Sequence, residues 1–213
     1  MTEILDIYDD SMRPLGTMAR DEAHRIGAWH KTFHCWIVRH DGQHGYVLFQ
    51  KRSSSKKQHP NKLDITAAGH ISSGETIDDG VREVAEELGV TIKMEDLQFL
   101  GIRTAASIAG TDVNREFNHV YLLRRDEPVS SYVLQQAEVS SLVQVEVADG
   151  LSLCSGRKSR VQATGVELDG AGAPVPIEIE IDMTDIIPRR DHYYYKIFIM
   201  AERHFAGNPD ICI

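Results

Sequence analysis

The chain has few cysteines and no long apolar segment. Its 213 residues include only Cys35, Cys154 and Cys212, which are odd in number, far apart and without a CxxC pair. This pattern argues against a disulfide framework and a cysteine zinc site, and it fits a reducing cytoplasm. No run of eighteen apolar residues occurs, and the opening MTEILDIYDDSM lacks the basic and apolar regions of a signal peptide. We therefore expect a cytoplasmic protein without a membrane partner.

Basic residues are also in deficit. The sequence holds 23 Lys and Arg against 32 Asp and Glu, which gives a formal net charge of −9. Because affinity for nucleic-acid polymers depends largely on Lys and Arg that neutralise phosphates, we expect no nucleic-acid partner. With 42% hydrophobic residues, the chain can bury a sizeable core, and we expect one domain over residues 1–213.

Apolar runs alternate with one clear helix, a pattern that predicts an α/β domain. A short helix or ordered loop is expected at 20–27 and a C-terminal helix at 192–205. The runs at 160–168 and 176–183 flank a Gly-Ala-Gly turn and predict a hairpin. Six other runs predict strands: 4–8, 33–39, 45–51, 97–103, 119–124 and 138–147. The second and third of these flank Asp41-Gly42, which predicts a hairpin turn.

The segment 69–90, GHISSGETIDDGVREVAEELGV, places carboxylates on one side of a helix. At about 100° per residue, Glu83, Glu86 and Glu87 fall within an arc of roughly 100°, opposite an apolar face. Thr76 and Asp79 form a plausible capping pair. An ordinary surface helix with a solvated acidic face is the alternative. Clustered carboxylates repel one another unless a cation compensates, and Mg²⁺ prefers oxygen ligands, so the segment predicts a metal site for diphosphate chemistry.

At these residues the chain resembles the Nudix hydrolases, whose box reads G, five residues, E, seven residues, then REUXEEXGU with U an apolar residue. Gly69, Glu75 and the block 82–90 fit this box. Only six residues separate Glu75 from Arg82 instead of seven. The deletion falls in the first helical turn, so it affects the placement of Glu75 and leaves the spacing within the block intact.

The resemblance implies a Nudix-type α/β/α sandwich with a mixed sheet and an inserted C-terminal β-hairpin. Within 1–213, we expect an N-terminal extension at 1–28, the inserted hairpin at 157–190, and a C-terminal helix and tail at 191–213. The resemblance also implies that Mg²⁺, or Mn²⁺, is bound by Glu83, Glu86 and Glu87 with the Gly69 carbonyl nearby. Arg82 is expected to hold the carboxylates in place.

Within the superfamily, the chain is similar to the branch of type I isopentenyl-diphosphate isomerases and their hydrolase relatives. Four local matches carry this similarity: WHKTFHCW from Trp29, QKRSSSKKQHPNKLD from Gln50, TAAGHIS from Thr66 and NREFNHVY from Asn114. They imply substrate phosphate contacts at Arg52 and Lys56. They also imply a second metal site for an ion such as Zn²⁺ or Mn²⁺, made by His24, His30, His70 and Glu116. Because Asn118 replaces one negative ligand, we expect this site to be partly occupied or empty, and the alternative is that the histidines contact phosphate. Glu116 or a box glutamate is expected to accept the proton of the attacking water.

Two departures from the isomerases affect the predicted reaction. Ala68 stands where they carry the active-site cysteine, and Asn118 stands where they carry a second glutamate. Because isomerisation needs two positioned acid–base groups, we expect Mg²⁺-dependent hydrolysis of a phosphoanhydride in a nucleoside-diphosphate derivative or related small-molecule diphosphate. The alternatives are an isopentenyl-diphosphate isomerase-like enzyme and a non-catalytic diphosphate-binding module. Arg189 and Arg190 follow Pro188, and a charged surface loop is expected there; the alternative is that the two arginines close over a diphosphate. An exposed hairpin edge favours a homodimer.

Overall fold

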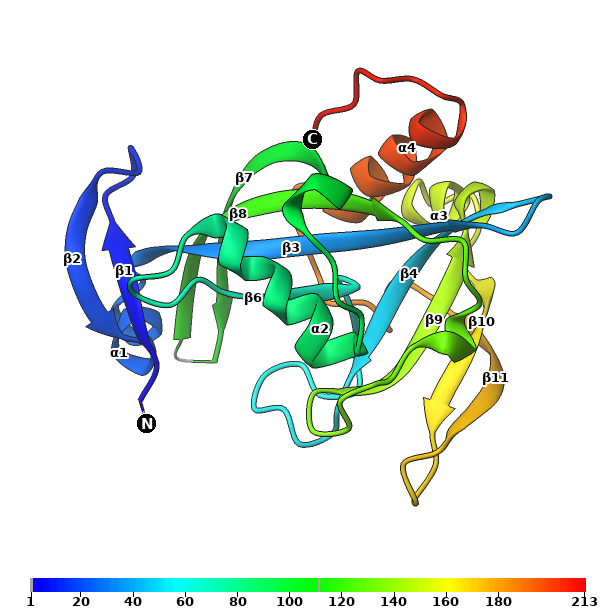
Figure 1. Ribbon diagram of the computed structural model, residues 1–213, viewed down its shortest axis with the longest axis horizontal. Helices are drawn as coiled ribbons and strands as arrows, with labels where there is room; N and C mark the ends of the chain where they lie inside the picture. The colour runs from blue at the N-terminus through cyan, green and yellow to red at the C-terminus, as the bar shows by residue number, and fades with distance from the viewer. Residues whose placement is uncertain (1, 111) are drawn as a thin grey trace.

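The computed structural model describes residues 2–110 and 112–213, and this part of the chain forms one mixed sheet of eleven strands flanked by four α-helices (Figure 1). The strands are β1 (Ile4–Tyr8), β2 (Pro14–Ala19), β3 (Trp29–His40), β4 (Gly45–Arg52), β5 (Leu63–Asp64), β6 (Ala67–His70), β7 (Gln98–Ala109), β8 (Asp112–Arg124), β9 (Val139–Glu146), β10 (Val161–Leu168) and β11 (Pro174–Ile181). The helices are α1 (Arg20–Ile26), α2 (Arg82–Leu88), α3 (Val147–Cys154) and α4 (Tyr193–Phe205). All predicted strands, the short helix and the C-terminal helix are thereby confirmed.

Strand β3 organises the sheet. Along one edge it pairs in parallel with β8, and β8 pairs with β7 in an antiparallel hairpin. Its other edge is divided among three partners, because Trp29 pairs with β1, residues 32–35 pair with β6 and residues 38–40 pair with β4. From β4 the order continues through β9 and β10 to β11. The sheet therefore opens where β4 and β6 separate, and the cavity described below lies there.

Alternate residues of β3 face the two helical layers. Phe33 and Ile37 pack in one core with Leu88 of α2. Trp36 packs in the other core with Phe198 of α4. Successive side chains of a strand point to opposite faces, so the sheet lies between α2 on one side and α3 and α4 on the other, and the predicted α/β/α sandwich is confirmed.

The helix that carries the acidic residues begins with a tighter turn than predicted. Residues Ile77–Val81 form a 3₁₀ turn, and α2 follows from Arg82. The predicted capping pair is present, since both the backbone N–H and the hydroxyl of Thr76 donate to Asp79, at 2.7 and 2.8 Å. Within this turn Gly80 lies directly on Phe33, and a Cβ there would be 2.6 Å from the ring. This close approach fixes the turn against β3.

Two elements have no counterpart among the predicted ones. Strand β2 carries Pro14 and Gly16 and is largely exposed, so its sequence shows no alternating pattern. Helix α3 is only eight residues long and begins at Val147, where the strand β9 ends. It packs so closely on α4 that a Cβ on Gly150 would lie 2.1 Å from the Phe198 ring. Tertiary packing, and not local propensity, stabilises this helix.

The predicted hairpin, β10 and β11, extends the main sheet by pairing with β9. Strand β11 is last in the strand order and forms an edge of the sheet. The predicted homodimer through this edge stays a prediction. The same holds for the predicted segment boundaries at residues 28, 157 and 190. No helix in the described ranges is long and apolar enough to cross a membrane.

Candidate active site

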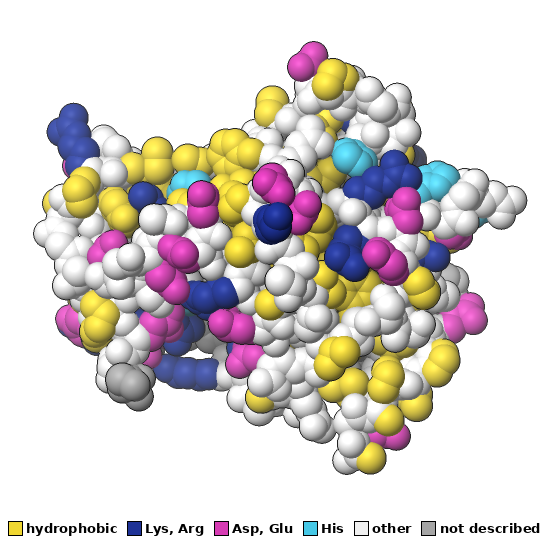
Figure 2. All heavy atoms as spheres, in the orientation of Figure 1, with side chains coloured by type: hydrophobic (Ala, Val, Ile, Leu, Met, Phe, Trp, Pro, Cys, Tyr) yellow, Lys and Arg dark blue, Asp and Glu magenta, His cyan; other side chains and the backbone are white. Residues whose placement is uncertain are grey.

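A polar cavity of about 1040 Å³ lies between β3, β6, α2 and the segment that precedes α4. Figure 2 shows Lys and Arg side chains inside a hollow on this face, with Asp and Glu side chains around it. Eight carboxylates and five Lys or Arg side chains line the cavity. Because this excess of acid would repel a phosphate, the lining suits an anionic substrate only together with bound cations.

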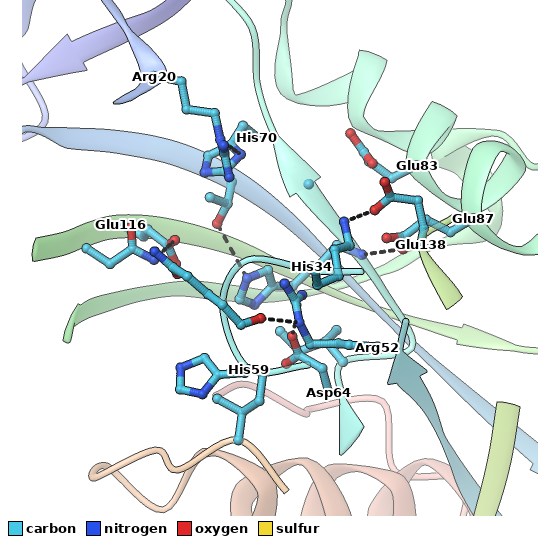
Figure 3. A pocket seen from close by; sticks show the side chains of 18 of the residues that line it. Arg20, His34, Arg52, His59, Asp64, His70, Glu83, Glu87, Glu116 and Glu138 are labelled. Atoms are coloured by element: carbon cyan, nitrogen blue, oxygen red, sulfur yellow. Dashed lines mark hydrogen bonds and ion pairs between the residues drawn. The ribbon is translucent and has the colours of Figure 1, made fainter. Parts of the chain in front are cut away.

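Glu83 and Glu87 form the acidic side of the cavity (Figure 3). Glu87 is 6% exposed, and its Oε2 accepts hydrogen bonds from the Ala68 amide and the Gln50 side chain, both at 3.1 Å. Burial raises the pKa of Glu87 to about 8, and the nearby Glu83 acts in the same direction. Burial also raises the pKa of Glu83, against the opposing effect of Arg82. A divalent cation would stabilise both carboxylates in their charged form.

Gly69 makes room for the Glu83 carboxylate. A Cβ on Gly69 would lie 2.0 Å from Glu83 Cδ and 2.1 Å from Oε1. Only glycine permits this approach of a carboxylate to the backbone of β6. The pocket between Gly69, Glu83 and Glu87 offers hard oxygen donors, so its residues fit Mg²⁺.

Arg82 joins the carboxylates of the box. Its Nε and Nη2 donate to the two oxygens of Glu75 at 2.9 and 3.0 Å, and Nη2 also donates to the His70 carbonyl at 3.0 Å. Its Nη1 contacts Glu83, and it lies 3.5 Å from Glu86 Oε2. Thus the one-residue deletion leaves Glu75 in contact with Arg82, while Glu86 stays largely exposed.

Three histidines converge on the opposite side of the cavity. The rings of His24, His30 and His70 lie 5.0 to 5.2 Å apart, and their ligand atoms lie within 4.8 Å of one another. All three Nε2 atoms are buried without a hydrogen-bond partner. His30 Nδ1 lies 3.0 Å from the Ala28 carbonyl, and a proton there leaves the Nε2 lone pair free. Glu116 Oε1 lies 3.9 Å from His30 Nε2.

The surroundings of His24 and His70 favour the neutral form of these two imidazoles. Burial, with His30 next to it, lowers the pKa of His24 to about 4. Burial and the same neighbour lower the pKa of His70 well below its ordinary value. Neutral imidazole is the form that binds metal, and three nitrogens with one carboxylate suit Zn²⁺ or Mn²⁺. The sequence-predicted set is therefore brought together in a geometry that could hold a metal.

The two predicted phosphate contacts both line the cavity. Arg52 donates from Nε to the Gln58 carbonyl at 3.2 Å and lies 3.4 Å from Asp64 through Nη1. Lys56 is paired with Glu138. Figure 3 shows Arg52 and Asp64 between the histidine side and the Glu83 and Glu87 side.

The expectation that Arg189 lies in a charged surface loop is wrong. Its side chain is 15% exposed, lines the cavity and lies 3.4 Å from Asp64. Arg190, by contrast, is exposed as expected. The difference in exposure between Arg189 and Arg190 comes from tertiary contacts of the segment between β11 and α4. No local pattern in the sequence distinguishes the two arginines. Gln50 and Asp64 were also missed, although both lie within the segment QKRSSSKKQHPNKLD.

The positions that depart from the isomerase pattern hold no acid–base group. Ala68 lines the cavity. Asn118 is fully buried and accepts from Arg103 Nη1 at 2.6 Å, while its Nδ2 donates to Thr32 and Glu116 at 2.7 and 2.8 Å. Cys35 is buried in the core under α2, and burial raises the pKa of its thiol. Within the described residues, no cysteine lines the cavity.

Comparison with known proteins identifies the family. The NUDIX domain family model matches residues 28–155. A Clostridium acetobutylicum protein named as an uncharacterized Nudix hydrolase is 38% identical over 199 residues, which cover 93% of this chain and 96% of that protein. The chain therefore belongs to the Nudix family and is a Nudix hydrolase, a pyrophosphohydrolase.

More distant similarities agree with this assignment. Nudix hydrolase 3 of Arabidopsis thaliana is 37% identical over 66% of this chain, although the match spans 19% of the plant protein. An isopentenyl-diphosphate Delta-isomerase of Salmonella heidelberg is 35% identical over 88 residues, 40% of this chain and 47% of the enzyme. The crystal structure of a Deinococcus radiodurans protein matches with a TM-score of 0.53 and 24% identity over 72% of this chain and 90% of that one, which supports the fold.

Proposed function

We propose that the protein hydrolyses a phosphoanhydride bond of a small-molecule diphosphate with Mg²⁺ at the Glu83 and Glu87 side of the cavity. The observation that carries this proposal is the close approach of Glu83 to Gly69, next to the buried Glu87 carboxylate. Mn²⁺ can replace Mg²⁺ at a site of this kind, because both accept carboxylate oxygens.

Each residue of the box has a role in this proposal. Glu83 and Glu87, with the Gly69 carbonyl, hold the metal, which supplies charge neutralisation on the phosphates and a lowered pKa for water. Arg82 fixes the Glu83 carboxylate. Glu86 is 60% exposed, so it is free to orient water and accept its proton. Arg52 and Lys56 bind the phosphates.

The histidine side is assigned a separate metal. His24, His30, His70 and Glu116 supply the donors, and the three unpartnered Nε2 atoms support this assignment. The Glu116 carboxylate already accepts from Asn114 and Asn118. These bonds hold it toward His30, which favours a ligand role for Glu116 over that of a mobile base.

The cavity lining favours a polar substrate. Over residues 2–110 and 112–213, no Phe, Tyr or Trp side chain lines the cavity. A nucleobase commonly stacks on such rings, and a prenyl chain needs an apolar wall. A diphosphate attached to a polar group is therefore a better fit than a nucleoside or prenyl diphosphate. Among the candidate substrates, nucleoside-diphosphate derivatives rank second.

The isomerase-like alternative is disfavoured because neither Ala68 nor Asn118 can transfer a proton. The test is NMR of isopentenyl diphosphate incubated with the protein and Mg²⁺, in which formation of dimethylallyl diphosphate would overturn the hydrolase proposal. A binding module would instead show stabilisation by a ligand without any product after long incubation.

The main experiment screens dinucleotides, nucleotides, nucleotide sugars, sugar diphosphates and prenyl diphosphates with Mg²⁺ and Mn²⁺ for their hydrolysis products, which are nucleoside monophosphates, sugar phosphates, prenyl phosphates, phosphate or pyrophosphate. On the best substrate, Glu87→Gln should lower kcat by about 10²-fold or more. Glu178→Gln changes an exposed glutamate of β11 and is the matched control. Full turnover by Glu87→Gln would show that the role assigned to this carboxylate is wrong.

A further inference from the structure

Arg189 adds a positive charge to the lining of the cavity. It lies in the segment between β11 and α4, outside the residues matched by the family model. Its Nη2 lies 3.4 Å from Asp64 Oδ1, and its buried Nε has no hydrogen-bond partner. Burial opposes the charge of Arg189, but Asp64 raises its pKa above the ordinary value, so the guanidinium remains protonated.

Asp64 is shared by two guanidinium groups. Its Oδ2 lies 3.4 Å from Arg52 Nη1, and its Oδ1 faces Arg189 at the same distance. The three side chains together carry one excess positive charge. At Arg82 acid exceeds base, because this single guanidinium contacts three carboxylates. The Arg52, Asp64 and Arg189 group is therefore the part of the cavity where base exceeds acid.

Contacts at both ends hold the segment that carries Arg189. At its start, the Leu63 amide donates to the Asp185 carbonyl at 2.8 Å, and the Ile187 amide donates to the Leu63 carbonyl at 3.0 Å. At its end, Asp191 accepts two bonds from Arg103, at 2.6 and 2.8 Å. The Arg189 side chain thus projects from a backbone fixed on both sides, as a preorganised binding residue requires.

We propose that Arg189 and Arg52 form an anion subsite that binds a phosphate group of the substrate, at the ends of β4 and β5 beside the segment that precedes α4. Both guanidiniums offer N–H groups to planar or tetrahedral oxyanions, and their contacts with Asp64 are too long to be strong hydrogen bonds. An arriving phosphate can therefore take donors from both without breaking a tight ion pair. This inference rests on the proposed diphosphatase function and assigns its substrate-binding end.

The inference is tested by binding, which does not depend on turnover. Isothermal titration calorimetry is carried out in excess Mg²⁺ with methylenediphosphonate, a diphosphate analogue whose P–C–P bridge is not hydrolysed. Arg189→Gln and Arg52→Gln should each weaken binding about tenfold or more. Arg190→Gln removes the same charge from the adjacent, exposed position and should stay within about twofold of the parent.

Three results would contradict the proposed subsite. The parent protein does not bind the probe, or Arg189→Gln binds it with parental affinity. The third is that Arg190→Gln loses as much affinity as Arg189→Gln, which would mean that only net charge matters. If Arg189→Gln does not fold, Arg189→Lys decides the question, because it keeps the charge but loses the planar fork. It should bind several-fold more weakly than the parent, and parental affinity contradicts the inference. The hydrolase proposal is judged separately by the turnover of Glu87→Gln.

Discussion

The Glu83 carboxylate occupies the space that a side chain on Gly69 would fill. A Cβ at position 69 would lie within 2.4 Å of all three atoms of that carboxylate. Gly69 and Glu83, the first glutamate of the REVAEE block, lie fourteen positions apart in the sequence and are therefore fitted to each other. Any side chain at 69 must displace Glu83 and, with it, the Arg82 contact.

Gly69→Ala should lower kcat about 10²-fold, since a displacement of about 1 Å in a catalytic group has an effect of that size. The measurement is the steady-state rate on the substrate found by the screen, with the thermal midpoint of unfolding as a folding check. Gly170→Ala is the control, because a Cβ on Gly170 meets nothing within 4 Å. An active Gly69→Ala enzyme would mean that Glu83 is not a metal ligand.

Asp191→Asn should loosen the segment that positions Arg189. Arg103 is 9% exposed and would keep its charge without its bidentate partner. We expect the free energy of unfolding to fall by about 1–2 kcal/mol and the KM for the diphosphate substrate to rise, with a smaller change in kcat. Chemical denaturation and steady-state kinetics measure these effects.

The control for Asp191→Asn is Glu180→Gln, which breaks the exposed ion pair between Arg160 and Glu180. Such a pair contributes less than about 1 kcal/mol. Equal losses of stability in the two variants, with KM unchanged in both, would contradict the positioning role of Asp191.

The histidine cluster should retain a transition metal. Elemental analysis of tag-free protein is expected to find Zn²⁺ or Mn²⁺ in the parent and in His44→Ala, an exposed control. The His30→Ala, His70→Ala double variant should lose it, because two of the three nitrogen donors are gone. If the double variant retains as much metal as the parent, this cluster is not the ligand set.

His34 should make stability depend on pH. The Tyr193 hydroxyl contacts its Nδ1 at 3.0 Å, and burial lowers the pKa of His34 well below its ordinary value, with Arg189 adding to the effect. The unfolded state takes up a proton near pH 6.5 and the folded state does not. The free energy of unfolding should therefore fall as the pH drops below about 6.5, by up to about 1.4 kcal/mol per pH unit from this residue.

Urea denaturation between pH 7 and pH 5 checks this dependence. His34→Gln should show a shallower fall in the free energy of unfolding than the parent, although His24 and His70 still contribute with the same sign. His192→Gln changes an exposed imidazole and is expected to keep the parental slope. A parental slope in His34→Gln would refute the assignment.

Much of the fold and the acidic side of the site could be predicted because the signals are local. The 3.6-residue period places Glu83 and Glu87 together on one helix face, and the Thr76 and Asp79 cap marks where the helical segment begins. Alternating apolar residues define β3 and its two buried faces. Such patterns need only the geometry of a single element.

The histidine cluster needed more than local pattern. His24, His30 and His70 come from α1, β3 and β6, and spacing alone does not bring three elements together. The resemblance to the isomerase branch predicted that the three histidines lie together. The pairing of β6 with β3 brings His70 close to His30, because Thr32 of β3 faces His70 directly.

The tertiary structure alone decided the position of Arg189. In the sequence Arg189 and Arg190 are equivalent neighbours after a proline, yet one lines the cavity and the other is exposed. The difference arises from the contacts of residues 185–187 with Leu63 and from the pairing of Asp191 with Arg103. These partners lie 88 or more positions away in the chain. The sequence by itself determined the helix that carries Glu83 and Glu87, whose spacing is local, whereas the basic end of the cavity depends on contacts that form only when distant segments pack.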